Sequence, residues 1–302
     1  MPNLAVNQDD YRIISFKEYL NHQPVKDHLL KKYAWVKSII VAIFPLPNQN
    51  VEKQNYLTAK FAYGKDYHQV VKEQLENLAI SLQLKRYETF TDVSFLDEKL
   101  LCYLAGLGSY GKNNLIITPK YGTNIVIGEI ITDEVFPYEK RIVPDVCLDC
   151  NLCVKKCPTN ALDKGFNRQS CLSYLTQYPS KDYSLYDKLT DLAVGCDICQ
   201  DVCPNNKKTY PYFDDFQFDE KSVINLEVLR NLDEKKYQEY YHDKTFNWIG
   251  YLKMLRNIIV LDVNNNNISY EEIENFQKLY QSEKWFNNHL AYLKGKINHG
   301  KY

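Results

Sequence analysis

Residues 145–158 are DVCLDCNLCVKKCP, and a second cysteine-rich stretch, GCDICQDVCP, occupies residues 195–204. The first stretch has four cysteines with the spacing C-x2-C-x2-C-x3-C-P, whereas the second has only three. In ferredoxins that carry two 4Fe-4S clusters, the fourth cysteine of such a run ligates the other cluster. Because each cluster needs four thiolates, the two stretches together lack one ligand.

Cys171, in RQSCLSYLT, is the remaining cysteine near these stretches and therefore the candidate for the missing ligand. A zinc site or buried free thiols are the alternatives, but zinc has no use for the proline that follows the last cysteine of each stretch. Cys102 stands apart, and we expect it to be a buried apolar residue. The sequence thus predicts two clusters, one held by Cys147, Cys150, Cys153 and Cys203, and the other by Cys157, Cys171, Cys196 and Cys199.

Composition predicts a globular protein of the cytoplasm. The chain has 302 residues, of which 45% are hydrophobic and 25% charged, and its net charge is −1. It has neither the run of about 20 apolar residues that a membrane span requires nor the layout of a signal peptide at its N-terminus. In a reducing compartment, clustered cysteines indicate metal ligands more than disulfides.

Three regions follow one another along the chain. Residues 1–140 have the pattern of an α/β domain, 141–212 form the cysteine-rich module, and 213–302 are helical in period. We expect helices over 17–33, 66–83 and 95–108, strands over 35–47 and 86–94, and a β-hairpin over 113–133. In the last region, the apolar spacing predicts helices over 222–232, 246–263, 268–282 and 283–297.

Several segments carry a resemblance to a known family. KFAYGKDYHQVVKEQLENLA at 60–79, the run from TDVS to ITD at 91–133, and FNWIGYLKMLRNIIVL at 246–261 flank the cysteine region in the same order as in epoxyqueuosine reductases. The G-K-D-Y-H and A-G-L-G-x-x-G-K-N motifs make the resemblance specific. It implies an α+β protein with a cobalamin-binding α/β domain similar to those of reductive dehalogenases and cobalamin-processing proteins, a ferredoxin-like module and a small HEAT-like helical region.

The resemblance also implies an activity. These enzymes use cobalamin, held base-off and supplied with electrons by two 4Fe-4S clusters, to remove the epoxide oxygen of epoxyqueuosine at the wobble position of tRNA. A flavodoxin- or ferredoxin-type protein would supply the electrons, and we expect a monomer. The helical tail is shorter than is typical of the family. A reductive dehalogenase-like enzyme and a plain ferredoxin-type electron-transfer protein are the two alternatives.

Asp92, in the motif TDVS, corresponds to the position at which the family has its general acid. Such an acid must keep its proton in a shielded pocket beside the cofactor. The alternative is that Asp92 caps the helix that follows, because aspartate is common at that position. Asp97 and Glu98 are expected in the first turn of the helix, where they would interact with its dipole. His68 is as well explained by a capping or surface role as by ligation.

The glycine-rich turn AGLGSYGKNN at 105–114 lacks the spacing of a nucleotide-phosphate loop. Its glycines would let the backbone approach a large flat ligand, although a purely structural turn is the alternative. By analogy with the family, the corrin contacts would be Lys112, Asn113, Asn114 and Ile116, with Ser173, Tyr174, Gly195 and Asp197 at the other edge. Residues beside cluster ligands also commonly hydrogen-bond to sulfur.

Support for RNA binding is modest at this level. Lysines alternate with aromatic residues in the segment 60–68, and further lysines lie at 155–156, at 207–208 and in the helical tail. Lysines bind phosphates and aromatic rings stack on unpaired bases. Since such runs are more often solvated faces, each patch alone is weak support for tRNA contact.

Overall fold

The computed structural model describes residues 6–48, 51, 56–138, 145–147 and 150–299. The chain divides into two compact units, each built from three separate stretches. The first unit is Met1–Gln49, Gly64–Cys153 and Gln200–Gln217, and the second is Asn50–Tyr63, Val154–Cys199 and Phe218–Tyr302. The three domains predicted from composition have other bounds than these units, and that division remains a prediction.

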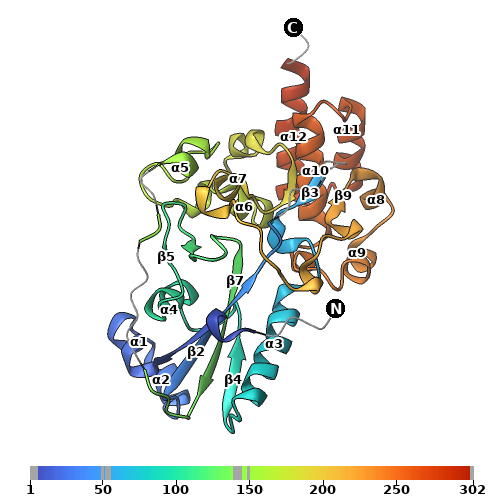
Figure 1. The fold of residues 1–302 in the computed structure, drawn as a ribbon. Coiled ribbons are helices and arrows are strands. Elements are labelled where there is room, and N and C mark those ends of the chain that lie inside the picture. Colours follow the sequence, from blue (N-terminus) through green and yellow to red (C-terminus); the bar gives the residue numbers. More distant parts are fainter. Residues whose placement is uncertain (1–5, 49–50, 52–55, 139–144, 148–149, 300–302) are drawn as a thin grey trace. The chain divides into compact units, whose positions relative to one another are not determined.

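The first unit contains a four-stranded antiparallel sheet with the strand order β1-β2-β7-β4 (Figure 1). Strand β2 is buried at every position, because SIIVAIFP has apolar side chains for both faces. It pairs with β7 along its whole length, from Ser38 opposite Thr132 to Pro45 opposite Ile125. The strands are β1 (Tyr11–Ser15), β2 (Ser38–Pro45), β4 (Tyr87–Phe90) and β7 (Ile125–Thr132). A separate ribbon joins β5 (Ser109–Tyr110) to β6 (Ile116–Ile117).

Helices α3 (Tyr67–Ser81) and α4 (Glu98–Leu104) cover opposite faces of this sheet. A Cβ atom on Gly128 would lie 2.7 Å from Val71 and 2.9 Å from Leu75, both on α3. The flanking strand residue Ile127 points to the other face, where it shares a core with Leu101 of α4. Both faces of β7 are thus buried, which explains its long apolar run. The helices α1 (Phe16–His22) and α2 (Asp27–Lys32) complete this unit.

Two sequence-based expectations about this unit are wrong. The helix expected over 17–33 is interrupted between α1 and α2, where Pro24 lacks the N–H needed to continue a helix. The hairpin expected over 113–133 does not form either. After the narrow turn that pairs Thr118 with Gly122, β7 leaves β6 and enters the larger sheet between β2 and β4. The apolar faces of β7 are buried there, which a two-stranded hairpin cannot achieve.

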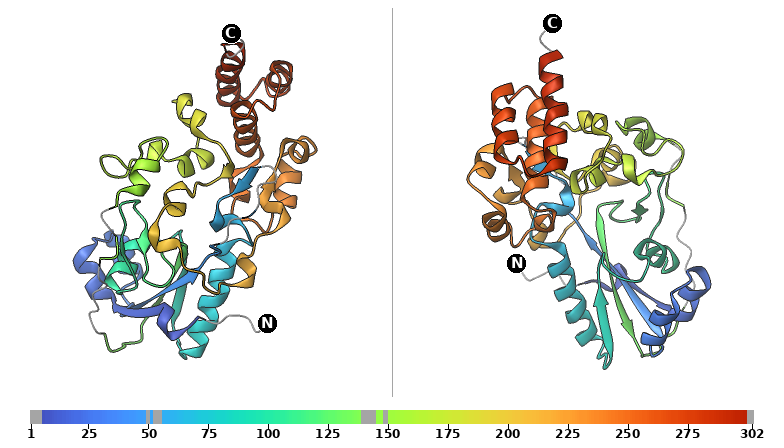
Figure 2. Two further views of the ribbon diagram at one scale, coloured as in Figure 1. Left: turned by 45° about the horizontal axis from the view of Figure 1, so that its top comes forward. Right: turned by 180° about the vertical axis from the view of Figure 1, so that it is seen from behind.

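The second unit is mainly helical. Its core surrounds α10 (Tyr251–Asn264), whose residues from Met254 to Val263 are all buried. Figure 2 shows α10 beside α11 (Tyr270–Leu279) and α12 (Lys284–His299), as the sequence predicted for the tail. The other helices are α5 (Leu152–Lys156) and α7 (Ile198–Asp201), each shared with the first unit, α6 (Leu172–Gln177), α8 (Leu226–Arg230) and α9 (Glu234–Tyr240). The strands β3 (Tyr56–Thr58), β8 (Leu192–Val194) and β9 (Val223–Ile224) form a small sheet in the order β8-β3-β9.

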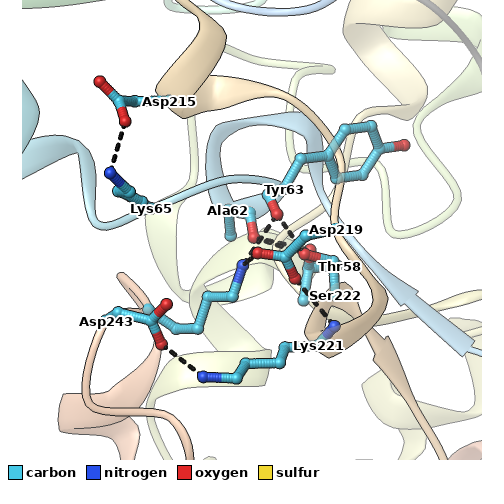
Figure 3. Close-up of polar contacts among 10 residues, drawn as sticks. Thr58, Ala62, Tyr63, Lys65, Asp215, Asp219, Lys221, Ser222 and Asp243 are labelled. Atoms are coloured by element: carbon cyan, nitrogen blue, oxygen red, sulfur yellow. Dashed lines mark hydrogen bonds and ion pairs between the residues drawn. The ribbon is translucent and has the colours of Figure 1, made fainter.

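A buried lysine ties distant segments of the second unit together. Lys244, whose side chain is fully buried, donates a hydrogen bond to the carbonyl of Tyr63 at 3.0 Å and pairs with Asp219. Ser222 donates to the carbonyl of Ala62 at 3.2 Å (Figure 3). Burial lowers the pKa of Lys244, while its bond to Asp219 opposes that shift. The partners compensate for the cost of burying a charge. None of the helices in the described ranges has the length and apolar character of a membrane span.

The close approach of α3 to β7 leads to a stability prediction. We expect Gly128→Val to lower the free energy of unfolding by about 1–3 kcal/mol, because the added carbons overlap Val71 and Leu75. Urea unfolding followed by circular dichroism measures this change. The control is Gly295→Ala in α12, which should be neutral or slightly stabilising, because an added Cβ meets no atom of the described residues within 4 Å. Equal stability of both variants would contradict this packing.

Candidate functional site

Asp92 lies in the loop between β4 and α4, in the left-handed backbone conformation with φ of 58°. Non-glycine residues seldom adopt this conformation, although aspartate tolerates it better than most. Asp92 does not cap α4. That position is held by Asp97, whose carboxylate accepts a hydrogen bond from the backbone N–H of Leu100 at 3.0 Å. The capping explanation considered for Asp92 is therefore wrong, and its side chain is available for another role.

The N-terminus of α3 supplies the neighbours of Asp92. The Tyr67 hydroxyl donates to Asp92 Oδ2 at 3.1 Å, and His68 Nε2 lies 3.4 Å from the same oxygen. Asp66 caps α3 and also holds His68, with 2.7 Å between Oδ1 and Nδ1. The motif G-K-D-Y-H therefore forms a helix start whose first residues turn toward Asp92.

His68 is positively charged at neutral pH in this setting. Burial alone would lower its pKa, but hydrogen bonds to Asp66 and Asp92, together with their charges, raise the pKa of His68 to about 9. Both ring nitrogens then donate, one to each carboxylate. The side chain of Asp92 is 59% exposed, so the loop presents a carboxyl group to solvent with a cation held behind it.

Two further carboxyl groups lie near Asp92 and behave differently. Glu98 accepts a hydrogen bond from the backbone N–H of Asp92. Burial, and then the charges of Asp92 and Asp97, raise the pKa of Glu98 to about 7. Glu129 in β7 is 0% exposed, and neither of its carboxyl oxygens has a hydrogen-bond partner among the described residues. Burial and the charge of Glu98 raise the pKa of Glu129 well above its usual range.

A cavity of about 520 Å³, partly open to solvent, lies beside these groups. Its apolar wall is formed by Leu115, Ile116, Ile125, Val126 and Ile127, and its polar wall by Tyr67, Thr91, Glu98, Lys99 and Thr123. Of the predicted corrin contacts, Ile116 lines this cavity. Asn114 adjoins it through its carbonyl, which accepts a hydrogen bond from Lys99 Nζ at 2.8 Å. A flat apolar ring with polar substituents would fit such a surface.

Four of the cysteines line a second cavity of the first unit, which encloses about 360 Å³ including space open to solvent. They are Cys147, Cys150, Cys153 and Cys203, the set that the spacing predicts for one cluster. Lys112 and Asn113 line the same cavity, and the backbone N–H of Lys112 donates to Cys147 Sγ at 3.4 Å. The structure therefore brings these two predicted corrin contacts to the cysteines.

The other four cysteines all belong to the second unit. Burial, and then the charges of Cys171 and Cys157 among others, raise the pKa of Cys196 to about 12. These three thiols are therefore close in space, and a bound metal would reverse the shift because it favours the thiolate. No three His, Cys, Asp or Glu side chains in the described part converge as ready-made metal ligands. The assignment of these cysteines to clusters thus depends on their spacing in the sequence and on their shared location in the fold.

The residues predicted beside this second set have structural partners. Asp197 is buried, accepts a hydrogen bond from the backbone N–H of Lys60 at 2.8 Å, and lies 3.8 Å from Lys60 Nζ. Gly195 has φ of 78°, and a Cβ there would lie 2.5 Å from Ala59. Tyr174 stacks on Tyr178 with 4.6 Å between ring centroids. The carbonyl of Ser173 accepts a hydrogen bond from Gln177 at 2.9 Å. Their contact with a corrin remains a prediction.

Sequence reasoning missed part of the site at Asp92. The sequence gives Tyr67 no role there, explains His68 equally well as a capping or surface residue and as a ligand, and assigns Glu98 only to the helix dipole. Glu129 was overlooked, although one carboxylate within the apolar run IVIGEIIT is an unusual signal. That signal alone could have pointed to the site.

The raised pKa of Glu98 gives a pH-dependent prediction. Because Glu98 binds its proton more tightly in the folded state than in the unfolded state, the protein loses stability as pH rises from about 4.5 to about 7. We therefore expect Glu98→Gln to be more stable than the wild type at pH 8, by about 1–3 kcal/mol, with the difference shrinking toward pH 4.5. Urea unfolding across this range measures it. The control is Glu271→Gln at an exposed position, which should change the free energy of unfolding by no more than about 0.5 kcal/mol at any pH. If the stability of Glu98→Gln differed from that of the wild type by the same amount at every pH, the raised pKa of Glu98 would be refuted.

Two protein families match separate parts of the chain. The family described as epoxyqueuosine reductase QueG, DUF1730, matches residues 28–97, and the 4Fe-4S double cluster binding domain matches residues 146–206. The second match includes all eight cysteines of the two predicted sets. The chain therefore contains a domain of the kind that binds two 4Fe-4S clusters.

Curated relatives agree with both matches. The epoxyqueuosine reductase of Listeria monocytogenes is 34% identical over 220 residues, covering 67% of this chain and 56% of the relative. That of Staphylococcus aureus is 31% identical over 214 residues, covering 68% and 56%. The Lactococcus garvieae enzyme is 32% identical over 238 residues, covering 74% and 68%. The match thus spans little more than half of the first two relatives.

Solved structures have the same fold. The epoxyqueuosine reductase of Streptococcus thermophilus superposes with a TM-score of 0.81 at 23% identity, covering 97% of this chain and 87% of that chain. An epoxyqueuosine reductase with an epoxyqueuosine-modified stem loop of tyrosine tRNA gives a TM-score of 0.80 at 23% identity, with the same coverage. Since sequence, domain content and fold agree, this chain belongs to the epoxyqueuosine reductase family.

Proposed function

We propose that this protein reduces epoxyqueuosine to queuosine in tRNA. The observation that carries the proposal is the carboxyl, histidine and tyrosine cluster around Asp92, beside an apolar-walled cavity, in a chain that also has a two-cluster domain. Removing the epoxide oxygen as water consumes two electrons and two protons, so the site needs both an electron supply and a proton supply. Neither the dehalogenase-like alternative nor the electron-transfer alternative is favoured by a specific feature.

The eight cysteines would supply the electrons. We assign Cys147, Cys150, Cys153 and Cys203 to one cluster, and Cys157, Cys171, Cys196 and Cys199 to the other. The shared cavity of the first set and the interacting thiols of the second support this division. A soluble low-potential donor of the flavodoxin or ferredoxin type would reduce them in the cytoplasm, with the protein acting as a monomer.

Cobalamin would be held at the cavity beside Asp92. When bound, it supplies a strongly reducing cobalt centre, while the protein contributes position and protons. Ile116 and the neighbouring aliphatic side chains would face the corrin ring, and Asn114, with Lys112 and Asn113, would lie along one edge. Ser173, Tyr174, Gly195 and Asp197 are the candidates for the other edge. The first unit would then be the cobalamin-binding domain that the family resemblance implies.

Asp92 would donate a proton to the departing oxygen, after receiving that proton from the His68 imidazolium, whose Nε2 lies 3.4 Å from Asp92 Oδ2. His68 and Tyr67 orient its carboxyl group by contacts to Oδ2. Glu98, which carries a proton up to about pH 7, lies against the same loop and is suited to supply the second proton. A solved Bacillus subtilis epoxyqueuosine reductase is described with its catalytic loop swung out of the active site. An exposed loop of this kind could likewise bring Asp92 to the substrate.

An aromatic surface of the second unit is suited to the tRNA. Tyr178, stacked on Tyr174, lies 5.6 Å from Trp248, and both Tyr178 and Trp248 are exposed. The guanidinium of Arg168 lies 4.9 Å from the ring of Tyr174, and Lys253 Nζ lies 5.6 Å from that of Trp248. Rings stack on unpaired bases while the cations bind phosphates. The helices α10–α12 would form the HEAT-like region that supports this surface.

The acid assignment predicts the effect of Asp92→Asn. This variant should lose at least about a hundredfold in turnover, since it cannot donate the proton, while its iron content stays unchanged. The test incubates reconstituted protein, cobalamin and a reductant with tRNA bearing epoxyqueuosine, and follows the loss of one oxygen by mass spectrometry. The control is Asp97→Asn in the same loop, which still caps α4 and should keep near wild-type activity. Wild-type turnover by Asp92→Asn would refute the assignment.

The ligand assignment predicts the effect of Cys171→Ala. This variant should bind about half of the wild-type iron, because one of the two clusters loses a ligand. Iron analysis after anaerobic reconstitution measures the loss. Cys102→Ala removes a buried cysteine outside both sets and should keep the full complement. A full complement in Cys171→Ala would show that the eighth ligand lies elsewhere.

A further inference from the structure

The side-chain amide of Asn113 is buried without a complete set of partners. The residue is 5% exposed, and its Oδ1 accepts a hydrogen bond from the backbone N–H of Leu115 at 3.3 Å. That bond directs the oxygen toward the turn. Nδ2 is buried and has no hydrogen-bond partner among the described residues. Leaving a buried N–H without an acceptor costs about 1–3 kcal/mol, so this group needs an explanation.

The surroundings of Asn113 indicate which acceptor is missing. Asn113 lines the cavity that also has Cys147, Cys150, Cys153 and Cys203 on its wall. The preceding residue, Lys112, already donates its backbone N–H to Cys147 Sγ. Two consecutive residues of this turn, Lys112 and Asn113, therefore line a cavity that has four cysteines on its wall. A 4Fe-4S cluster bound in this cavity would bring sulfur acceptors close to Asn113, whose Nδ2 has no hydrogen-bond partner among the described residues.

Gly111 keeps the amide in this position. A Cβ atom at Gly111 would lie 2.5 Å from Asn113 Oδ1 and 2.8 Å from Ile117 Cδ1. Any larger residue would push the amide away from its site. The glycine in the motif G-K-N is thus required by the packing of the asparagine side chain, independently of any backbone conformation.

We propose that Asn113 Nδ2 donates a hydrogen bond to a sulfur of the cluster held by this cysteine set, and so raises the reduction potential of that cluster. Reduction adds negative charge to the cluster, and a hydrogen bond to the more negative sulfur is stronger. Hydrogen bonds to cluster sulfurs are among the protein features that set such potentials. This role rests on the cluster assignment alone and is independent of cobalamin and of the tRNA substrate.

Asn113→Leu removes the donor at similar size and without adding charge. The reconstituted protein, without corrin or tRNA, is titrated with reductant and followed by electron paramagnetic resonance. We expect one cluster to become harder to reduce, with its reduced-to-oxidised ratio falling about tenfold at a fixed potential, equal to about 59 mV for one electron. The other cluster serves as the internal control and should keep its midpoint. Unchanged midpoints with full iron content would overturn the proposal.

Gly111→Ala provides a second test if the leucine variant fails to hold its clusters. It retains Asn113 but displaces the amide, and should shift the same midpoint in the same direction. A purely structural role would lower iron content or stability in both variants without moving the potential of the cluster that remains bound. Full iron content with unchanged midpoints in Gly111→Ala would again overturn the proposal. Because no turnover is measured, the result stands or falls separately from the proposed tRNA activity.

Discussion

The first unit depends on the packing of β7 between two helices at consecutive residues. Gly128 lets α3 approach the strand closely on one face, while Glu129 points to the face covered by α4. Adjacent residues of a strand face opposite sides of the sheet. Gly128 therefore sets how closely α3 approaches β7, while Glu129 sets the electrostatics beneath α4. Burying Glu129 is unfavourable unless it stays neutral. The loop that carries Asp92 is held between the N-termini of these helices.

That arrangement separates the charges of the titratable groups. His68 is held as a cation by Asp66 and Asp92, whereas burial and neighbouring charges raise the pKa of Glu98 to about 7 and the pKa of Glu129 well above its usual range. The charge of His68 is paired with two carboxylates, whereas Glu98 and Glu129 are buried from water and lie close to other carboxyl groups. Raised carboxyl pKa values suit the proposed reaction, which consumes protons along with electrons.

Each cysteine-rich stretch is divided between the two units. The first stretch gives Cys147, Cys150 and Cys153 to the first unit and Cys157 to the second, while Cys203 returns from the second stretch to the first. The proposed ligand sets follow this division, since the fourth cysteine of such a run ligates the other cluster in two-cluster ferredoxins. Each unit therefore has four of the eight thiols, although neither stretch alone contains a full set for one cluster.

The sequence by itself determined the match to a two-cluster domain, the buried strand β2 and the helices α3 and α10, because cysteine spacing and apolar period are local properties of the chain. The break between α1 and α2 also has a local cause, Pro24. The prediction of one helix followed the apolar period of the flanking residues instead. Only the tertiary structure decided that β7 joins the central sheet, that Asp97 rather than Asp92 caps α4, and that Glu129 is buried with no hydrogen-bond partner among the described residues. These outcomes depend on which distant residues pack against each group, since burial and neighbouring charges, more than residue type, set a hydrogen bond or a pKa.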